Sequence, residues 1–100
     1  MIRHIVFFRM KGGGAEEIRR NALELKARLE ALPPLIPQIQ HLECGLDVVR
    51  SEASYDLSLT VDVHDLSALE AYRVHPAHQK VVAFVKEVTT ARAVVDYEVA

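Results

Sequence analysis

Residues 2–10 form a candidate strand with apolar side chains on both faces, and this limits how the chain can fold. The segment IRHIVFFRM is rich in Ile, Val and Phe, which favour β-strands. Successive strand side chains point to opposite faces. One face carries Ile2, His4, Val6, Phe8 and Met10, and the other carries Arg3, Ile5, Phe7 and Arg9. We expect both faces to be covered, which one layer of helices cannot do. The pattern leaves open which face turns toward the helices.

Hydrophobic periodicity predicts the order β-α-β-β-α-β along the chain. The first helix has one apolar stripe and is ended by Pro33 and Pro34. Ser67 is a candidate N-cap for the next helix, with Glu70 completing a capping box. Gly45 is a candidate bulge. After the first strand, the predicted elements are a helix over 15–32, strands over 38–49 and 55–63, short helix 68–74, helix 77–88 and strand 91–99.

This order predicts an α+β fold, a ferredoxin-like monomer with an antiparallel four-stranded sheet and both helices on one face. We interpret residues 1–100 as a single domain, since the length suits one domain and no linker or repeat interrupts it. The other face of the sheet is left bare. Burial against a second copy is the simplest solution, so we expect a homodimer.

Composition argues against several classes of partner. The net charge is −2 and no stretch is a basic run, which argues against nucleic acid. No apolar run approaches the roughly 20 residues of a transmembrane helix, so we expect no membrane partner. Cys44 is the single cysteine and MIRHIVFF does not resemble a signal peptide. We therefore expect a cytoplasmic protein.

The segment YRVHPAHQ, residues 72–79, concentrates titratable side chains at a predicted helix start. Proline is favoured at the first helical position, which makes His75 the cap and places His78 in the first turn after Pro76. The positive end of the helix dipole favours a neutral imidazole there, and a neutral imidazole can accept a proton. Alternatively, both histidines simply complete a helix start on the surface.

Two further side chains are candidates for the same site. His4 lies on an otherwise apolar face and could line a cavity with the 72–78 segment, or it could be a hydrogen-bonded core residue. Asp96 interrupts an apolar run in the last strand and could orient a histidine, or it could face water at a strand edge. The histidine spacing does not fit a HExxH-type zinc site, and no cysteine pair is present, so we expect no metal ligands.

Several motifs together resemble the stress-responsive dimeric α/β-barrel family over essentially the whole chain. They are RHIVFFRMK, IPQI, ECG, YDLSLTV, AYRVHPAHQ and VVDYE. The resemblance implies a ferredoxin-like monomer whose sheet pairs with that of a second copy to form a dimeric barrel.

Within that family the segment resembles plant polyketide cyclases, which perform an aldol condensation without a cofactor. The resemblance implies His78 as general base, Asp96 as its orienting group, Tyr72 as hydrogen-bond donor to an enolate oxygen, and His4 as a substrate-placing residue. It also implies a substrate pocket lined by His75, Val6, Tyr55, Leu57 and Leu59. Ala27 and Leu57 stand where the cyclases have Tyr and His, which implies a more apolar pocket and another substrate. Some relatives bind magnesium through backbone carbonyls, here those of Pro33, Ile36 and Ile39.

The functional expectation is a homodimer with a small apolar ligand pocket. It would carry out cofactor-free cyclase-, lyase- or isomerase-like chemistry on a keto substrate through His78. The alternative is a dimer that binds a small ligand, or acts in a stress response, without catalysis. An oxygenase on the same fold is a third reading.

Overall fold

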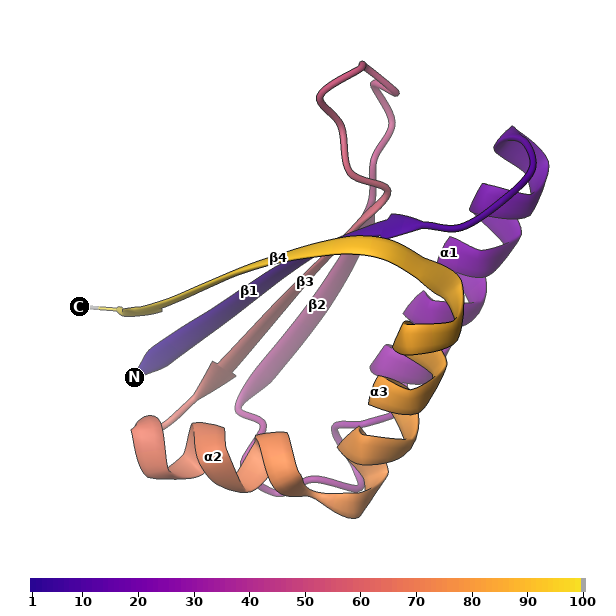
Figure 1. Cartoon of the computed structure of the whole chain (residues 1–100). Helices are drawn as coiled ribbons and strands as arrows, with labels where there is room; N and C mark the ends of the chain where they lie inside the picture. Colours follow the sequence, from indigo (N-terminus) through magenta and orange to yellow (C-terminus); the bar gives the residue numbers. More distant parts are fainter. Residues whose placement is uncertain (100) are drawn as a thin grey trace.

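Four antiparallel strands form one sheet in the order β2-β3-β1-β4, with the helices on one side of it (Figure 1). This is a computed structural model, and it describes residues 1–99. The arrangement confirms the expected ferredoxin-like β-α-β-β-α-β plan, with its second helical unit in two parts. The elements are β1 (Ile2–Met10), α1 (Ala15–Glu30), β2 (His41–Leu46), β3 (Leu57–Val63), α2 (Leu66–Val74), α3 (Pro76–Val88) and β4 (Thr89–Glu98).

The break between α2 and α3 lies where the sequence places it. His75 has an extended backbone, and its ring Nδ1 accepts a hydrogen bond from the Ala77 N–H. Pro76 begins α3, as expected of a residue without an N–H. The start of α2 differs from expectation, because Asp65 and not Ser67 is the N-cap. The Asp65 carboxylate accepts from the Ala68 N–H at 2.8 Å, so the helix begins before residue 68.

The even-numbered face of β1 turns toward the helices. Ile2, Val6, Phe8 and Met10 are all buried, together with the apolar stripe of α1 and the apolar side chains of β3. This settles the question that alternation alone leaves open. It also places His4, which shares that face, on the helix side of the sheet.

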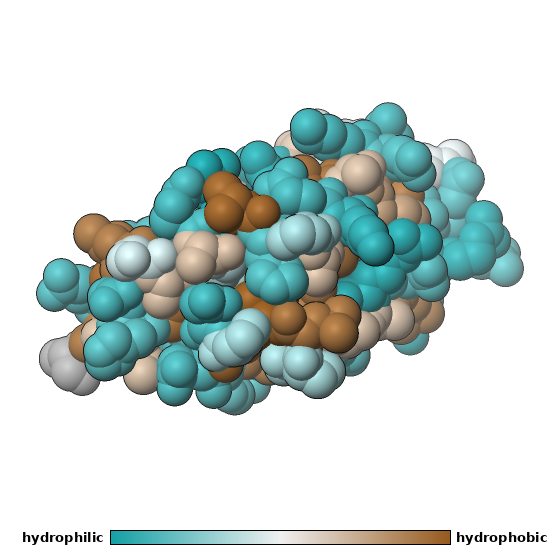
Figure 2. Space-filling model, turned by 90° about the horizontal axis from the view of Figure 1, so that it is seen from below, coloured by the Kyte–Doolittle hydropathy of each residue, from teal (hydrophilic) through white to brown (hydrophobic). Residues whose placement is uncertain are grey.

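The opposite face of the sheet, the outer face, is partly apolar and is uncovered in one chain. Phe7 is 45% exposed at the centre of β1, and Val95 and Tyr97 of β4 are exposed on the same face. The side of α2 is different: it is mostly hydrophilic, with separate hydrophobic patches (Figure 2). The outer face is therefore the surface that a second copy is expected to cover.

Two local expectations along β2 and β3 are wrong. The β2–β3 register runs without interruption through Gly45, so no bulge lies there; the irregularity in the sheet is between Arg9 and Met10, against β4. The third strand begins at Leu57 and not at Tyr55. Tyr55 packs against Phe7, with ring centroids 6.2 Å apart, and against the Arg9 guanidinium, which places it on the outer face.

Asp56 joins the start of β3 to the end of β1. Its backbone N–H donates to the Phe8 carbonyl at 2.8 Å, and its carboxylate accepts from the Met10 N–H at 2.6 Å. The other carboxylate oxygen accepts from Arg50 at 2.5 Å. Because Asp56 is only 7% exposed, it satisfies a buried backbone donor that water cannot reach easily.

Replacing Asp56 should therefore destabilise the fold. Asp56→Ala leaves the Met10 N–H without its acceptor, and we expect the free energy of unfolding to fall by about 1–3 kcal/mol. Urea denaturation followed by circular dichroism measures this change. Exposed Glu52 in the same loop is the control, and Glu52→Ala should change stability by less than about 0.5 kcal/mol. Equal effects of the two substitutions would show that Asp56 does not anchor the strands.

The outer face predicts a dimer in solution. Light scattering should give twice the 11.2 kDa of one chain. Phe7→Asp should shift the protein to the monomer, because it places a charge in an interface without removing a core side chain. Val48→Asp, at an exposed loop position, should leave the dimer intact. A wild-type monomer at micromolar concentration would contradict the prediction.

Candidate functional site

A half-open cavity of about 450 Å³ lies between the helix side of the sheet and the helices. Its walls are mainly apolar, and its polar groups come from β1, β4 and the α2–α3 junction. It is lined by His4, Val6, Phe8, Leu29, Leu59, Leu69, Tyr72, Arg73, His78, Gln79, Val81, Val82, Val85, Lys86, Arg92, Val94 and Asp96.

The cavity gathers most of the candidate residues from the sequence. His4, Tyr72, His78 and Asp96 all line it, with Val6 and Leu59 in the apolar wall. The other three expected lining residues lie elsewhere: His75 caps α3, Tyr55 is on the outer face and Leu57 is buried in the core without lining the cavity.

His78 is oriented by a backbone carbonyl. Its Nδ1 lies 2.9 Å from the carbonyl oxygen of Arg73. Since a carbonyl oxygen only accepts, Nδ1 carries the proton and Nε2 is the basic nitrogen of the neutral ring. Within residues 1–99 no hydrogen bond reaches Nε2. Asp96 was expected to orient this ring, but it bonds to His4.

The helix break makes that carbonyl available. In a continuous helix the Arg73 carbonyl would accept from the Ala77 N–H, four residues on. Here the Ala77 N–H is taken by the His75 ring. The Arg73 carbonyl instead accepts from His78 and, at 2.6 Å, from the side-chain amide of Gln79. Sequence reasoning identified the break but not this consequence of it.

Burial lowers the pKa of His78 below its usual value of 6.5. The hydrogen bond to the Arg73 carbonyl opposes the shift, and Coulomb interactions with His4, Arg92 and Arg73 add to it. The sequence predicted a neutral imidazole from the helix dipole. The direction agrees, although desolvation is the larger cause.

Tyr72 packs its ring against this base and carries a buried hydroxyl. The side chain is 1% exposed, and its ring centroid is 4.3 Å from that of His78. Its hydroxyl has no hydrogen-bond partner within residues 1–99. Burial raises the pKa of Tyr72, so the phenol keeps its proton at neutral pH. A buried, unpartnered donor costs stability, which makes it a candidate to bind a ligand oxygen.

His4 and Asp96 form a pair on the opposite wall. They face each other across the β1–β4 ladder, and His4 Nδ1 lies 2.5 Å from the Asp96 carboxylate. The carboxylate accepts, so His4 is held in the same Nδ1–H form as His78. Its ring stands edge-on to Tyr72 at a centroid distance of 5.9 Å. Both readings of Asp96 hold in part, because the carboxylate has a histidine partner and is still 38% exposed on the edge strand β4.

The turn suggested for magnesium carries a side-chain oxygen in addition to its backbone carbonyls. The Ile36 carbonyl accepts a hydrogen bond from the Ile39 N–H at 3.1 Å. Gln38 Oε1 is buried and has no hydrogen-bond partner within residues 1–99. Across the same residues, no three His, Cys, Asp or Glu side chains are grouped as metal ligands. The magnesium site therefore stays a prediction.

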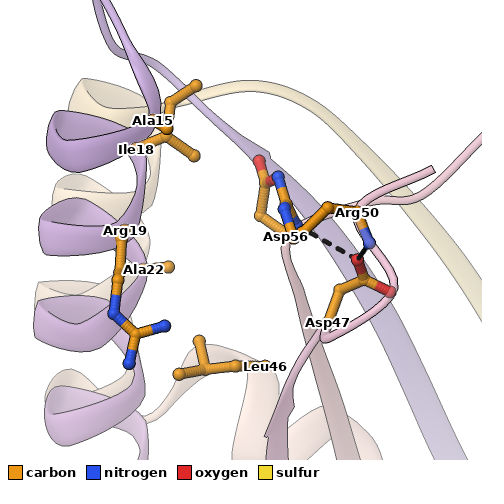
Figure 3. Close-up of a pocket in the computed structure, with 8 residues that line it drawn as sticks. All are labelled: Ala15, Ile18, Arg19, Ala22, Leu46, Asp47, Arg50 and Asp56. Carbon is orange, nitrogen blue, oxygen red and sulfur yellow. Dashed lines mark hydrogen bonds and ion pairs between the residues drawn. The ribbon is translucent and has the colours of Figure 1, made fainter. Parts of the chain in front are cut away.

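A second cavity, of about 220 Å³, lies between α1 and the loop after β2 (Figure 3). Ala15, Ile18 and Ala22 of α1 line one side of it, and Leu46 lies with Asp47, Arg50 and Asp56 on the side away from α1. Arg50 lies between Asp47 and Asp56 and bonds to both carboxylates. Arg50, Asp47 and Asp56 pair with one another and hold the loop in place, so they are not free to bind a ligand. The cavity of about 450 Å³ is therefore the candidate site.

The site and the fold together can be compared with known proteins. A sequence model of the Stress Responsive A/B Barrel Domain matches residues 2–99. This chain belongs to that family. The match agrees with the resemblance carried by the sequence motifs. In this A/B barrel protein, among residues 1–99, no helix could serve as a bilayer-spanning segment.

Relatives of the A/B barrel protein support the expected homodimer more strongly than a catalytic activity. An uncharacterized protein of Streptomyces coelicolor is 36% identical, covering 98% of this chain and 99% of that protein. A solved structure from Bacteroides fragilis is 30% identical, with a TM-score of 0.87 over 98% of this chain and 95% of that one. It is described as a dimeric protein of unknown function with a ferredoxin-like fold. The hydroxynitrile lyase from Passiflora edulis shares the fold, at 17% identity and a TM-score of 0.82 over 99% and 93% of the two chains.

The pKa of His78 is directly measurable. An NMR titration of its ring proton should give a midpoint below 6.5. Between that midpoint and 6.5 the unfolded chain binds more protons than the folded one. The free energy of unfolding should therefore fall as the pH is lowered through this window. His78→Asn should reduce that fall. A midpoint at or above 6.5 would contradict the proposed neutral base.

Proposed function

We propose that this protein is a cofactor-free lyase, isomerase or cyclase that removes a proton next to the carbonyl of a small, largely apolar keto compound. The observation that carries the proposal is the packing of the Tyr72 ring against His78. The Tyr72 hydroxyl is buried without a partner within residues 1–99, and the Arg73 carbonyl fixes His78 Nδ1. A base and a hydrogen-bond donor in one cavity are the two groups that enolisation requires.

His78 is the general base in this proposal. With Nδ1–H donated to the Arg73 carbonyl, Nε2 has the free lone pair. The lowered pKa keeps the ring neutral at physiological pH, so the base does not first have to lose a proton. When Nε2 takes the substrate proton, the ring becomes an imidazolium that still donates to the carbonyl.

Tyr72 is the donor to the carbonyl oxygen. Negative charge moves from the α-carbon to this oxygen as the proton leaves. A neutral phenol that is already buried can hydrogen-bond that oxygen without first being desolvated, because folding has already met the cost of burying it. The raised pKa of Tyr72 disfavours full proton transfer to the enolate and so keeps it a donor.

His4 and Asp96 close the opposite side of the site. Asp96 fixes the His4 ring, and we assign the pair to substrate placement. The apolar wall, with Val6, Leu59 and Val85, excludes water and would hold a hydrocarbon chain. The named lyase activity of the Passiflora edulis protein is compatible with such chemistry on this fold, although a shared fold does not by itself assign a function.

Deuterium exchange into a simple ketone tests the proposal without knowledge of the natural substrate. The protein should accelerate exchange of the α-protons of 2-octanone in D₂O, measured by proton NMR. His78→Ala should slow the catalysed exchange by about 100-fold or more, the usual contribution of a general base. Tyr72→Phe should slow it by roughly 10- to 100-fold, near the lower end for loss of an oxyanion donor.

The control is His64, an exposed histidine outside the cavity. His64→Ala should exchange at the wild-type rate. If wild type and His78→Ala give the same rate while 2-octanone still binds, the chemistry is absent. The alternative, a dimer that binds a small ligand without catalysis, would then be the better description.

A further inference from the structure

Two cationic side chains line the cavity and are left without partners by the rest of the chain. Lys86 reaches it from α3 and Arg92 from β4. Neither forms an ion pair or a side-chain hydrogen bond within residues 1–99. Arg73 lines the same cavity but differs, because Glu70 holds its guanidinium by two hydrogen bonds of 2.7 and 2.8 Å. The charges of Lys86 and Arg92 are therefore available to a ligand.

The charge balance of the cavity favours an anion. Asp96 is the one carboxylate among its described lining residues, and it is engaged by His4. Arg92 lies on the same face of β4 as Val94 and Asp96, so its guanidinium faces the helix side of the sheet. Its positive charge is one of the smaller causes of the lowered pKa of His78.

We infer that the substrate of this site is a keto acid whose carboxylate is bound by Arg92 and Lys86. Resting on the proposed function, this places the ketone at His78 and Tyr72 and an alkyl chain along the apolar wall. A guanidinium matches the two oxygens of a carboxylate in a bidentate pair, and an ammonium adds a point charge. The carboxylate is a binding group, and the transferred proton moves only between the α-carbon and His78.

A matched pair of probes separates this inference from general ketone chemistry. The probes are 4-oxononanoate and its methyl ester, which differ in the negative charge. In the exchange assay we expect KM for the acid to be about 10-fold or more below that for the ester. Arg92→Gln should raise KM for the acid by about 10-fold more than for the ester, and Lys86→Gln by a smaller factor.

Lys80→Gln is the matched control, because Lys80 is exposed on the same helix but does not line the cavity. It should leave the preference for the acid unchanged. If wild type exchanges acid and ester with equal KM, and Arg92→Gln affects both equally, the carboxylate assignment is wrong while the base chemistry stands.

Binding of nonanoate, which has no ketone, tests the anion site separately from catalysis. Isothermal titration calorimetry should show about 10-fold weaker binding to Arg92→Gln, and near wild-type binding to His78→Asn. Arg92-dependent binding without any exchange would retain the anion site and overturn the proposed function. Tighter binding of octyl phosphate than of nonanoate would overturn the carboxylate in favour of a phosphate.

Discussion

The register between β1 and β4 is the constraint on which the site depends. It pairs residue 4 with residue 96, so the two ends of the chain meet on the helix side of the sheet. Strand side chains alternate with a period of two, and a slip by one residue would move Asp96 to the outer face. His4 would then lose its carboxylate, and Arg92 would leave the cavity with it. The same register therefore positions a histidine–carboxylate hydrogen bond, a cation and part of the apolar wall.

Local sequence pattern predicted the elements of this fold well. Alternation gave the strands, and the Pro76 break with its His75 cap is as expected. The N-cap of α2 was predicted wrongly, at Ser67, although Asp65 two residues earlier is an equally suitable cap. His4, Tyr72 and His78 were predicted to share one site, partly from the strand and helix-start patterns and partly from the family resemblance.

Long-range pairing could not be predicted in the same way. Nothing near residue 96 in the sequence indicates that it faces residue 4 and not residue 78, because strand register is set by the whole sheet. The orienting group of His78 was missed because a backbone carbonyl leaves no trace in side-chain identity. Arg92 had a usable signal, because it alternates with Val94 and Asp96 along one strand face.

Because the Arg73 carbonyl orients His78, the position of the ring depends little on pH. A carboxylate in that position would gain a proton in acid and release the ring. An amide carbonyl has no ionisation in the biological range, so it accepts from Nδ1 both before and after the imidazole is protonated, and it bonds the charged ring more strongly. Only the ring itself titrates. The break between α2 and α3 thus supplies a hydrogen-bond acceptor that keeps the His78 ring in place in both of its charge states.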